Sequence, residues 1–483
     1  MEKRITTLKS YRLYGEKALP VTISVTISEG IGIHVVGIPD QQVREVLLRA
    51  ITALQRCGYR IPGKKTIINF SPVDHLKGDC SKYDLPVALG LIAASGQESF
   101  ALPEDGGAVI AGELGLDGSV RSVRGSLQGF LLSQGDRASA ILPFDNAMDA
   151  YAVTSDSLLY GVRSLPEAVS VLRGDDGSAA YRVSNLLEQD RTSRDALPEV
   201  AVPPPFDLPR LRTAAIAAAG GFGLYCQGEP GTAPHTMASL VRSLLSAPGR
   251  CEDRDLTLSL LGQPYGNTFT DVPLVEVYPD SRPRTLVGEA GSPGAVTAAH
   301  TGVLHIREAE KISKTTSTLL EAAYQDGEVH IHRLWGDFTY PCDILPVLTA
   351  VTERPATAPS VPGTLAPLWM QMHPLAPSAK ARRFHREEHS KACDAVRLAR
   401  QRALRRTQCP NARLTPEQCG DILTGRLDSA SVVKKISEAF GWDGDKRLTL
   451  VRIARTIADL DGTEEVTPGA VAEAAGYLNP HAA

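Results

Sequence analysis

The sequence lacks the features of a membrane or secreted protein. It contains no run of about 18 apolar residues, which a membrane-spanning helix requires. Its opening segment, MEKRITTLKSYRLYG, has no apolar core of the kind found in secretory signals. The eight cysteines include no Cys-x-x-Cys pair, which argues against a zinc cluster and against a disulfide framework. We therefore expect a cytoplasmic protein with no membrane partner.

A strong net charge is also missing. The 51 lysines and arginines are balanced by 55 acidic residues, so the formal charge is −4. This balance gives no general attraction to nucleic acid. One segment differs, because residues 380–406 contain ten basic residues and three acidic ones. A basic helix of this kind can bind DNA phosphates, or it can stay solvated or pack on an acidic neighbouring subunit, and these interpretations stay open.

A phosphate-binding loop in the middle of the chain lacks its lysine. A predicted strand leads into Gly-Glu-Pro-Gly-Thr at 228–232, as in nucleotide-binding P-loops. In those loops a following Lys contacts the phosphates and a Ser or Thr holds Mg²⁺. Without a gap, Pro234 replaces the Lys and His235 the Ser or Thr. With a one-residue insertion, His235 replaces the Lys and Thr236 holds Mg²⁺. The predicted nucleotide-binding residues are Gly228, Gly231, Thr232, Ala233, Pro234, His235 and Thr236.

Composition divides the chain into five parts. A length of 483 residues predicts roughly two to four domains. Regions with strand and helix patterns are separated by two stretches rich in proline, the first of which ends in Pro-Pro-Pro. We expect an α/β unit at 1–173, a linker at 174–208, a second α/β unit at 209–355, a connector at 356–379 and an all-helical unit at 380–483.

Hydrophobic periodicity predicts the elements of both α/β units. Asp40 is expected to begin a helix that stops at Gly58, and Ser164 to cap a helix over 164–174. Asp117 and Gly118 mark a hairpin within 109–123. Further strands are expected at 21–28, 32–37, 65–71, 222–227, 302–306 and 344–351. Further helices are expected at 84–96, 209–219, 235–246 and 312–326.

Several segments, in order along the chain, resemble the ComM/YifB family of magnesium-chelatase-like AAA+ proteins. They are LPVTISVTISEGIGIHVVGIPDQQVREVLLRAITALQRCG, YDLPVALGLIAASG, IAGELGLDGSVRSVRGSL, AAAGGFGLYCQGEPGT, GAVTAAHTGVLHIREAEKI, CDILPVLTAV, PNARLTPEQ and LVRIARTIADLDGTEEVTPGAVAEAAGYL. The resemblance covers nearly the whole chain. It implies an α/β multidomain fold with a ribosomal-S5/Lon-like α/β N-terminal domain, a P-loop AAA+ α/β core and an α-helical C-terminal lid.

The resemblance also implies a function. Characterised members of the family act as DNA helicases that promote branch migration during natural transformation, and AAA+ proteins usually assemble as hexameric rings. This implies ATP and Mg²⁺ as cofactors, DNA as a partner, and a homo-oligomeric ring in the bacterial cytoplasm.

The catalytic positions that the resemblance implies are altered. The family's Walker B strand ends in apolar residues followed by Asp-Glu. Here Arg307 stands in place of the Asp, and Glu308 in place of the catalytic Glu. A cation at this place repels Mg²⁺, so no metal-binding residue is predicted. Arg307 either supplies charge to the phosphates together with His235, or pairs with Glu308 or Glu310 in an inactive site.

Two hypotheses about function follow. The family's sensor-1 Asn falls near Thr352 and its sensor-2 Arg near Asp443–Asp445, with Arg447 close by. With these losses we expect ATP and Mg²⁺ to bind weakly or not at all, and ATP hydrolysis to be impaired or absent. The first hypothesis is a DNA-processing protein of the ComM/YifB type. The alternative is a non-hydrolysing scaffold or regulatory subunit that assembles with an intact AAA+ partner.

The resemblance to Lon raises the question of proteolysis, which needs a Ser-Lys dyad. Val87 occupies the position of the Ser, and Gln128 that of the Lys. Ser81 and Lys82 lie nearby, but adjacent residues are poorly placed to form a dyad. We therefore expect an N-terminal domain without protease activity.

A histidine pair offers a weak metal hypothesis. His330 and His332 are predicted on one face of a strand, because strand side chains alternate between faces. A metal site would need further ligands, with His305 as a third candidate. The interpretation we favour is a pair of polar residues on an exposed strand face.

Overall fold

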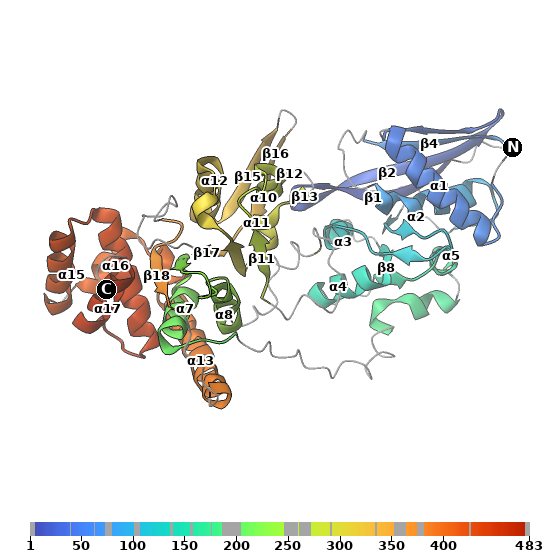
Figure 1. Ribbon diagram of the computed structural model, residues 1–483. Helices are drawn as coiled ribbons and strands as arrows, with labels where there is room; N and C mark the ends of the chain where they lie inside the picture. Colours follow the sequence, from blue (N-terminus) through green and yellow to red (C-terminus); the bar gives the residue numbers. More distant parts are fainter. Residues whose placement is uncertain are drawn as a thin grey trace.

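The structure is a computed structural model that describes most of the chain. It covers residues 5–38, 40–61, 63–72, 80–100, 107–135, 139–154, 158–174, 176–185, 204–245, 259, 272–289, 292–333, 336–351, 364–373, 381–424 and 427–478. An N-terminal α/β domain, a central α/β domain and a helical domain follow one another from right to left in Figure 1. None of the described helices combines the length and the apolar content of a membrane span.

The N-terminal domain is built on a seven-stranded sheet. Alternating side chains of β1 (Ile5–Tyr14) and β2 (Lys17–Ser28) place Leu8, Ile23 and Val25 in the core. The two strands form a long antiparallel hairpin. The sheet order is β3-β4-β2-β1-β5-β8-β9. Its other strands are β3 (Ile33–Val36), β4 (Lys65–Ser71), β5 (Ala108–Ile110), β8 (Ser139–Pro143) and β9 (Leu159–Val162).

Helices pack against this sheet. They are α1 (Asp40–Arg56), α2 (Asp84–Ala94), α3 (Ser126–Gly135), α4 (Phe144–Thr154) and α5 (Leu165–Arg173). The mostly apolar α2 is buried from Asp84 to Ile92. Asp84 accepts a hydrogen bond of 2.5 Å from Nε of Arg49, which ties α2 to α1. The hairpin predicted around Gly118 is formed by β6 (Glu113–Leu114) and β7 (Val120–Arg121).

The central domain contains a parallel five-stranded sheet in the order β11-β14-β17-β10-β18. Because the strands all point the same way, their carboxyl ends meet at one edge, where α/β proteins usually place ligands. The loop after β10 and the residues after β14 therefore converge at this edge. The strands are β10 (Leu224–Gly228), β11 (Leu274–Val277), β14 (Val303–Ile306), β17 (Leu345–Val351) and β18 (Leu368–Met372).

Each face of the central sheet belongs to a different apolar cluster. On one face, α7 (Leu208–Gly220) and α8 (Thr236–Leu244) join a core that continues into the helical domain. The other face joins α12 (Lys314–Asp326) and a hairpin of β15 (Glu328–Arg333) and β16 (Gly336–Pro341). The short elements between β11 and β14 are α10 (Pro283–Val287), β12 (Gly288–Glu289), β13 (Ser292–Pro293) and α11 (Ala295–Ala298).

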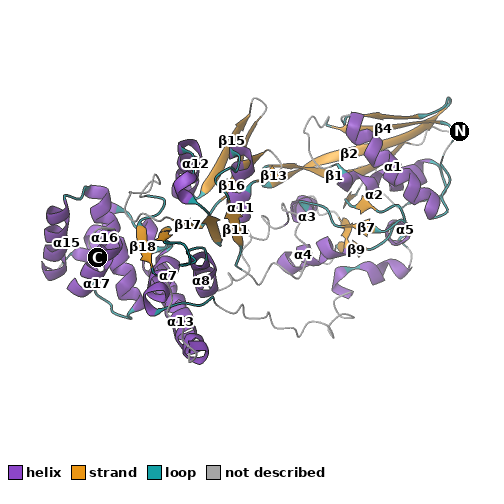
Figure 2. Ribbon diagram, in the orientation of Figure 1, coloured by secondary structure: helices purple, strands orange, loops and turns teal. Residues whose placement is uncertain are grey.

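The C-terminal domain is helical, as the sequence predicted. The long α13 (Ala381–Thr407) packs on α7 and on α16 (Gly444–Leu460). The other helices are α14 (Pro416–Leu423), α15 (Leu427–Phe440) and α17 (Pro468–Leu478). In Figure 2, α15, α16 and α17 lie at one end of the molecule, whereas α13 extends below α7 of the central domain. This completes the α/β core and helical C-terminal region that the resemblance implied.

Some local features differ from expectation. β1 was not predicted, although it pairs along its whole length with β2. The proline-rich connector contains β18, which is held by backbone pairing with β10 and so needs little sequence pattern. Ser164 occupies the N-cap of α5, but its side chain makes no capping hydrogen bond. Within the predicted linker, residues 176–181 form a short 3-10 helix, whereas 186–203 lie outside the described residues.

Candidate nucleotide-binding site

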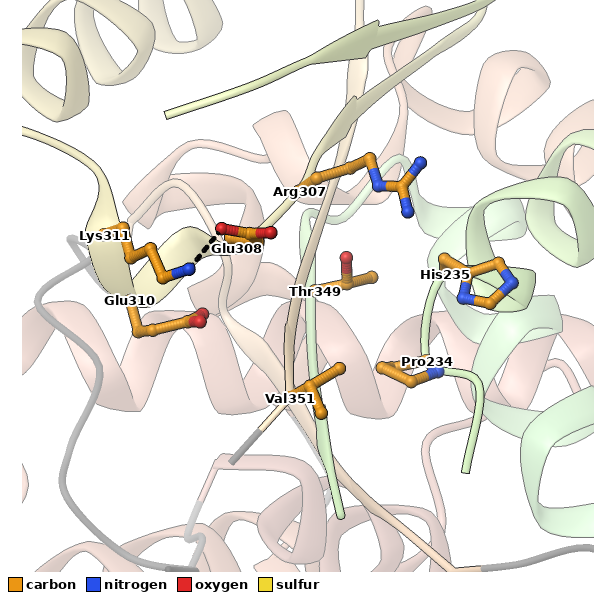
Figure 3. A pocket seen from close by; sticks show the side chains of 8 residues that line it. All are labelled: Pro234, His235, Arg307, Glu308, Glu310, Lys311, Thr349 and Val351. Carbon is orange, nitrogen blue, oxygen red and sulfur yellow. Dashed lines mark hydrogen bonds and ion pairs between the residues drawn. The ribbon is translucent and has the colours of Figure 1, made fainter. Parts of the chain in front are cut away.

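The carboxyl edge of the central sheet contains an open cavity of about 170 Å³. Pro234 and His235 lie on one side of it, and Glu308 and Lys311 on the opposite side (Figure 3). The lining residues are Pro234, His235, Arg307, Glu308, Glu310, Lys311, Thr349 and Val351. The fold therefore brings together the two segments that the sequence singled out, the P-loop-like loop and the Walker B-like strand.

The loop between β10 and α8 turns tightly. A Cβ on Gly228 would lie 2.1 Å from Oγ1 of Thr232, so this close approach requires a glycine. Gly231 and Ala233 both have positive φ, +93° and +53°. A left-handed conformation is unfavourable for Ala233 because its Cβ crowds the backbone. Pro234 has no N–H, so the loop offers one amide fewer to an anion.

The hydroxyl groups of the loop are used internally. Thr232 donates a hydrogen bond of 2.7 Å to the carbonyl of Glu229, and Thr236 donates one of 2.8 Å to the carbonyl of Ala233. Thr236 begins α8, and neither threonine lines the cavity. Gly228, Gly231 and Ala233 do not line it either. Of the predicted nucleotide-binding residues, only Pro234 and His235 face this space.

Arg307 is held by strand β11. Its guanidinium donates to Oε2 of Glu276 at 3.3 Å and to the hydroxyl of Tyr278 at 3.4 Å. Its central carbon lies 5.5 Å from the centre of the Tyr278 ring, within the range of a cation–π contact. Of the two alternatives that the sequence left open for Arg307, the pairing with Glu308 or Glu310 is not formed; the parallel register of β11 and β14 brings Glu276 beside the end of β14 instead.

His305, within β14, is buried and forms a chain of hydrogen bonds. Its Nδ1 lies 3.2 Å from Oε1 of Glu276, and its Nε2 lies 2.9 Å from Oγ1 of Thr349. Burial lowers the pKa of His305, and Glu276 opposes this only in part. A neutral ring that donates from Nδ1 must accept at Nε2, so the Thr349 hydroxyl donates to it. The chain links β11, β14 and β17 beneath the cavity.

Glu308 pairs with Lys311 across the first turn after β14. The Lys311 ammonium lies 2.5 Å from Oε2 of Glu308, and both side chains are more than half exposed. Glu308 has a φ of +47°, an uncommon conformation for a residue with a side chain. The hydrogen bond from Lys311 and its charge lower the pKa of Glu308, so the carboxylate is ionised and already has a cation partner.

Several residues of the site were missed from the sequence. Glu276 and Tyr278 lie on and just after β11, which the sequence analysis does not predict, and Thr349 lies in a segment predicted only as a buried strand. The alternation in Leu274–Val277 could have indicated a strand, but no pattern reveals which strand lies beside it. The sensor-1 position near Thr352 lies outside the described residues. Arg447, near the expected sensor-2 position, is exposed and does not line the cavity.

The other predicted positions lie elsewhere. Val87 is buried in α2 and Gln128 is buried in α3, so the places of the Lon dyad are filled by buried side chains without a nucleophile. Ser81 and Lys82 are consecutive in a short 3-10 helix before α2. The absence of protease activity stays a prediction.

The three histidines are not brought together. His330 and His332 are both exposed on one face of β15, as the alternation predicted. His332 lies 2.9 Å from Asp337 of β16. His305 belongs to a different sheet and is engaged by Glu276 and Thr349. The described residues contain no group of three or more metal-ligating side chains, so the third-ligand hypothesis for His305 is wrong.

The basic segment forms helix α13, and part of its charge is used inside the fold. Arg400 donates to the carbonyl of Ala218 at 2.8 Å, and Arg402 to that of Asp459 at 2.5 Å. Arg406 forms an ion pair of 2.8 Å with the Asp459 carboxylate. These hydrogen bonds and this ion pair attach α13 to α7 and α16. Fewer cations are therefore available to DNA than the sequence count suggests.

The comparisons agree with this architecture. A parallel sheet with a P-loop-like turn at its carboxyl edge, followed by a helical domain, defines the AAA+ class of fold. Three family models match successive parts of the chain. They are "Subunit ChlI of Mg-chelatase" over 23–146, "Magnesium chelatase, subunit ChlI" over 209–360, and "Magnesium chelatase, subunit ChlI C-terminal" over 387–478.

Similar proteins cover different shares of the chain. An uncharacterized protein of Mycobacterium tuberculosis is 32% identical over 68% of this chain, and the match spans 65% of its own length, less than two thirds. The protein YifB of Salmonella typhimurium is 25% identical over 96% of this chain and 95% of YifB. The competence protein ComM of Haemophilus influenzae is 24% identical over 96% of this chain and 95% of ComM. The chain belongs to the ComM/YifB family of magnesium-chelatase-like proteins.

Proposed function

We propose that this chain is a DNA-processing protein of the ComM/YifB type that does not hydrolyse ATP and acts as a non-hydrolysing subunit. The observation that carries the proposal is the position of Arg307. Arg307 occupies the sequence position where the resemblance implies the Mg²⁺-coordinating Asp, and Glu276 and Tyr278 hold its guanidinium. A fixed cation at this place opposes a divalent metal ion.

The cavity does not fit ATP bound to Mg²⁺. The Lys that would reach the phosphates is missing, and Pro234 also removes an amide donor at the loop. The carboxylate of Glu308, which would polarise the attacking water, is paired with Lys311. Hydrolysis needs the phosphates, the metal ion and the water to be held at once. Here the residues for the phosphates and the metal ion are replaced, and the carboxylate for the water is engaged by Lys311.

The DNA-processing part of the proposal rests on the family. The chain is similar over nearly its whole length to a protein named competence protein ComM, and the resemblance implies work on DNA. The assembly part rests on the AAA+ fold, which commonly forms rings. A chain that keeps this fold but loses the catalytic residues can complete a ring in which an intact AAA+ subunit hydrolyses ATP. A homo-oligomeric ring is the alternative assembly.

The test compares ATP turnover by the full-length protein and by Glu308→Gln, each with Mg²⁺ and single-stranded DNA. We expect no turnover above the level of the Glu308→Gln control, and weak or no binding of ATP·Mg²⁺ in a calorimetric titration. Turnover that Glu308→Gln abolishes would make the protein an active DNA motor and overturn the proposal.

For the assembly, an intact AAA+ protein from the same cell should co-purify with the chain. A protein that stays monomeric in gel filtration with such a partner would count against a subunit role.

Repair of the loop tests why hydrolysis is lost. Ala233→Gly, Pro234→Lys and His235→Thr together restore a Gly-Lys-Thr sequence, and we expect no measurable turnover from this variant. Arg307 would still oppose Mg²⁺, and two defects in one transition state are not relieved by correcting one. With Arg307→Asp added, ATP·Mg²⁺ binding should return while turnover stays low. Robust turnover from the loop repair alone would show that another residue holds the metal.

A further inference from the structure

The β1–β2 hairpin reaches from the N-terminal domain to the β15–β16 hairpin of the central domain, as Figure 1 shows. The ring of Tyr14, the last residue of β1, lies 4.6 Å from the ring of Phe338, centre to centre, at a tilt of 48°. Aromatic rings in such a tilted arrangement attract one another beyond the area they bury. Gly15, in the turn after Tyr14, is buried against the backbone of Thr339.

The contact depends on a glycine in β16. A Cβ on Gly336 would lie 2.0 Å from the hydroxyl oxygen of Tyr14 and 2.9 Å from its Cζ. These distances are shorter than van der Waals contact, so any larger residue would push Tyr14 away. Tyr14, Gly336 and Phe338 thus form a close-fitting contact between the hairpins, which we call the latch.

The inner face of the β15–β16 hairpin is buried around the latch. Phe338 and Tyr340 are almost completely buried, in one apolar cluster with Tyr11 and Leu13 of β1. The hydroxyl of Tyr340 donates a hydrogen bond of 2.8 Å to the carbonyl of Glu289. The N-terminal domain therefore covers part of the face by which this hairpin packs.

A second contact joins the two domains. The amide of Gly125 donates to the carbonyl of Ser259 at 2.8 Å, and the amide of Leu127 donates to its hydroxyl at 3.0 Å. Ser259 is itself buried. The latch is thus supported by a nearby polar attachment of the N-terminal domain.

The hairpin is connected along the chain to two parts of the cavity lining, Lys311 on one side and the residues of β17. It follows α12, which begins shortly after Lys311, and it leads into β17, which carries Thr349 and Val351. We propose that the latch holds the β15–β16 hairpin in one orientation, so that the N-terminal domain and the hairpin move together. This inference does not depend on whether the protein hydrolyses ATP.

The test measures hydrogen–deuterium exchange in the full-length protein and in Tyr14→Ala, Gly336→Ala and the double variant. Loss of the ring in Tyr14→Ala should speed amide exchange across 328–341 by about tenfold, because local opening becomes easier. Gly336→Ala should do the same by displacing Tyr14. The double variant should exchange no faster than Tyr14→Ala, because the added methyl group then meets no ring.

A matched control removes an aromatic ring elsewhere. Phe440 stacks on Trp442 at 5.2 Å in the helical domain, and Phe440→Ala should leave exchange at 328–341 unchanged. Exchange in β10 and β17 should also be unchanged in all the variants, which shows that the fold is intact. Three results would overturn the latch: an increase below about threefold at 328–341 in Tyr14→Ala, additive effects in the double variant, or equal acceleration in β10 and β17.

Discussion

Two carboxylates in this molecule each accept several hydrogen bonds, but one is partly exposed to solvent and the other is buried. Glu276, beside the cavity, accepts hydrogen bonds from His305, Arg307 and Tyr278 while its side chain is 41% exposed. Asp459, in α16 of the helical domain, is only 1% exposed. The same chemistry therefore holds a cation at an open edge in one place and joins helices in a dry interior in the other.

The buried carboxylate ties three separate segments together. Asp459 accepts from Arg406 of α13 and from Asn411 at 2.8 Å each, and from Arg455 of its own helix at 2.8 Å. Arg455 is almost completely buried as well. Burial would raise the pKa of Asp459, but the hydrogen bonds from Arg406 and Asn411 and the charge of Arg455 lower it overall. The comparison teaches that stability should depend on Asp459, whereas the exposed Glu276 and Arg307 shape the cavity.

Removal of the buried carboxylate of Asp459 should have the largest effect on the free energy of unfolding. Asp459→Ala removes the buried carboxylate that pairs with Arg455 and leaves that guanidinium with neutral carbonyl acceptors, so it should reduce the free energy of unfolding by about 3–5 kcal/mol in urea titration. Asp461→Ala is the matched control, because Asp461 is about half exposed where it pairs with Arg212. That control should cost less than about 1 kcal/mol. Equal losses in the two variants would refute the distinction between buried and exposed groups.

Lowering the pH should weaken the contribution of Asp459 to stability, with a smaller effect than removal of its side chain. The pKa of Asp459 is lower in the folded protein than in the unfolded chain, so its stabilisation is complete above the unfolded value, about 4. It is lost as the pH falls through the lower, folded pKa. The difference in unfolding free energy between the wild type and Asp459→Asn should therefore narrow between pH 5 and the acid limit of folding. A difference that stays constant over this range would show that the carboxylate charge is not the stabilising feature.

Removal of the partly exposed Arg307 side chain should have the smallest effect on the free energy of unfolding. Arg307→Ala should change the free energy of unfolding by less than about 1 kcal/mol, because solvent screens a half-exposed ion pair. Glu276 keeps its hydrogen bond to His305 in this variant. Thermal and urea unfolding of the variant and of Asp459→Ala, measured side by side, provide the check. A loss comparable to that of Asp459→Ala would mean that Arg307 is a structural residue of the core.

Much of the fold could be predicted from local pattern. The strand at Lys65–Ser71 was placed at its observed bounds, and the helix expected from Asp40 ends at Arg56, close to the predicted glycine stop. Both segments carry their own signal in the spacing of apolar residues. β18 carries almost none, because it is five residues long between proline-rich stretches and is defined by pairing with β10. Pairing between distant strands is the information that local pattern cannot supply.

The site was predictable in its sequence positions but not in its contacts. The loop at 228–236 and the strand that ends just before Arg307 do converge on one cavity, which the order of elements in P-loop proteins implies. The partner of Arg307 could not be predicted, because Glu276 is 31 residues away and is brought near only by the register of β11 and β14. The role of Thr349 depends on the same kind of register, between β14 and β17.

Ala233 shows how shape and chemistry can separate in one loop. Its φ of +53° is a conformation that glycine adopts freely and alanine adopts at a cost of about 1–2 kcal/mol. The hydroxyl of Thr236 donates a hydrogen bond to the carbonyl of Ala233. A close contact between Gly228 and Thr232 closes the turn just before Ala233. Contacts between neighbouring atoms of the chain thus hold the curve. The curve of the loop therefore does not depend on the residues that face the cavity: Thr236 and Gly228 hold the curve, whereas Pro234 and His235 line the cavity.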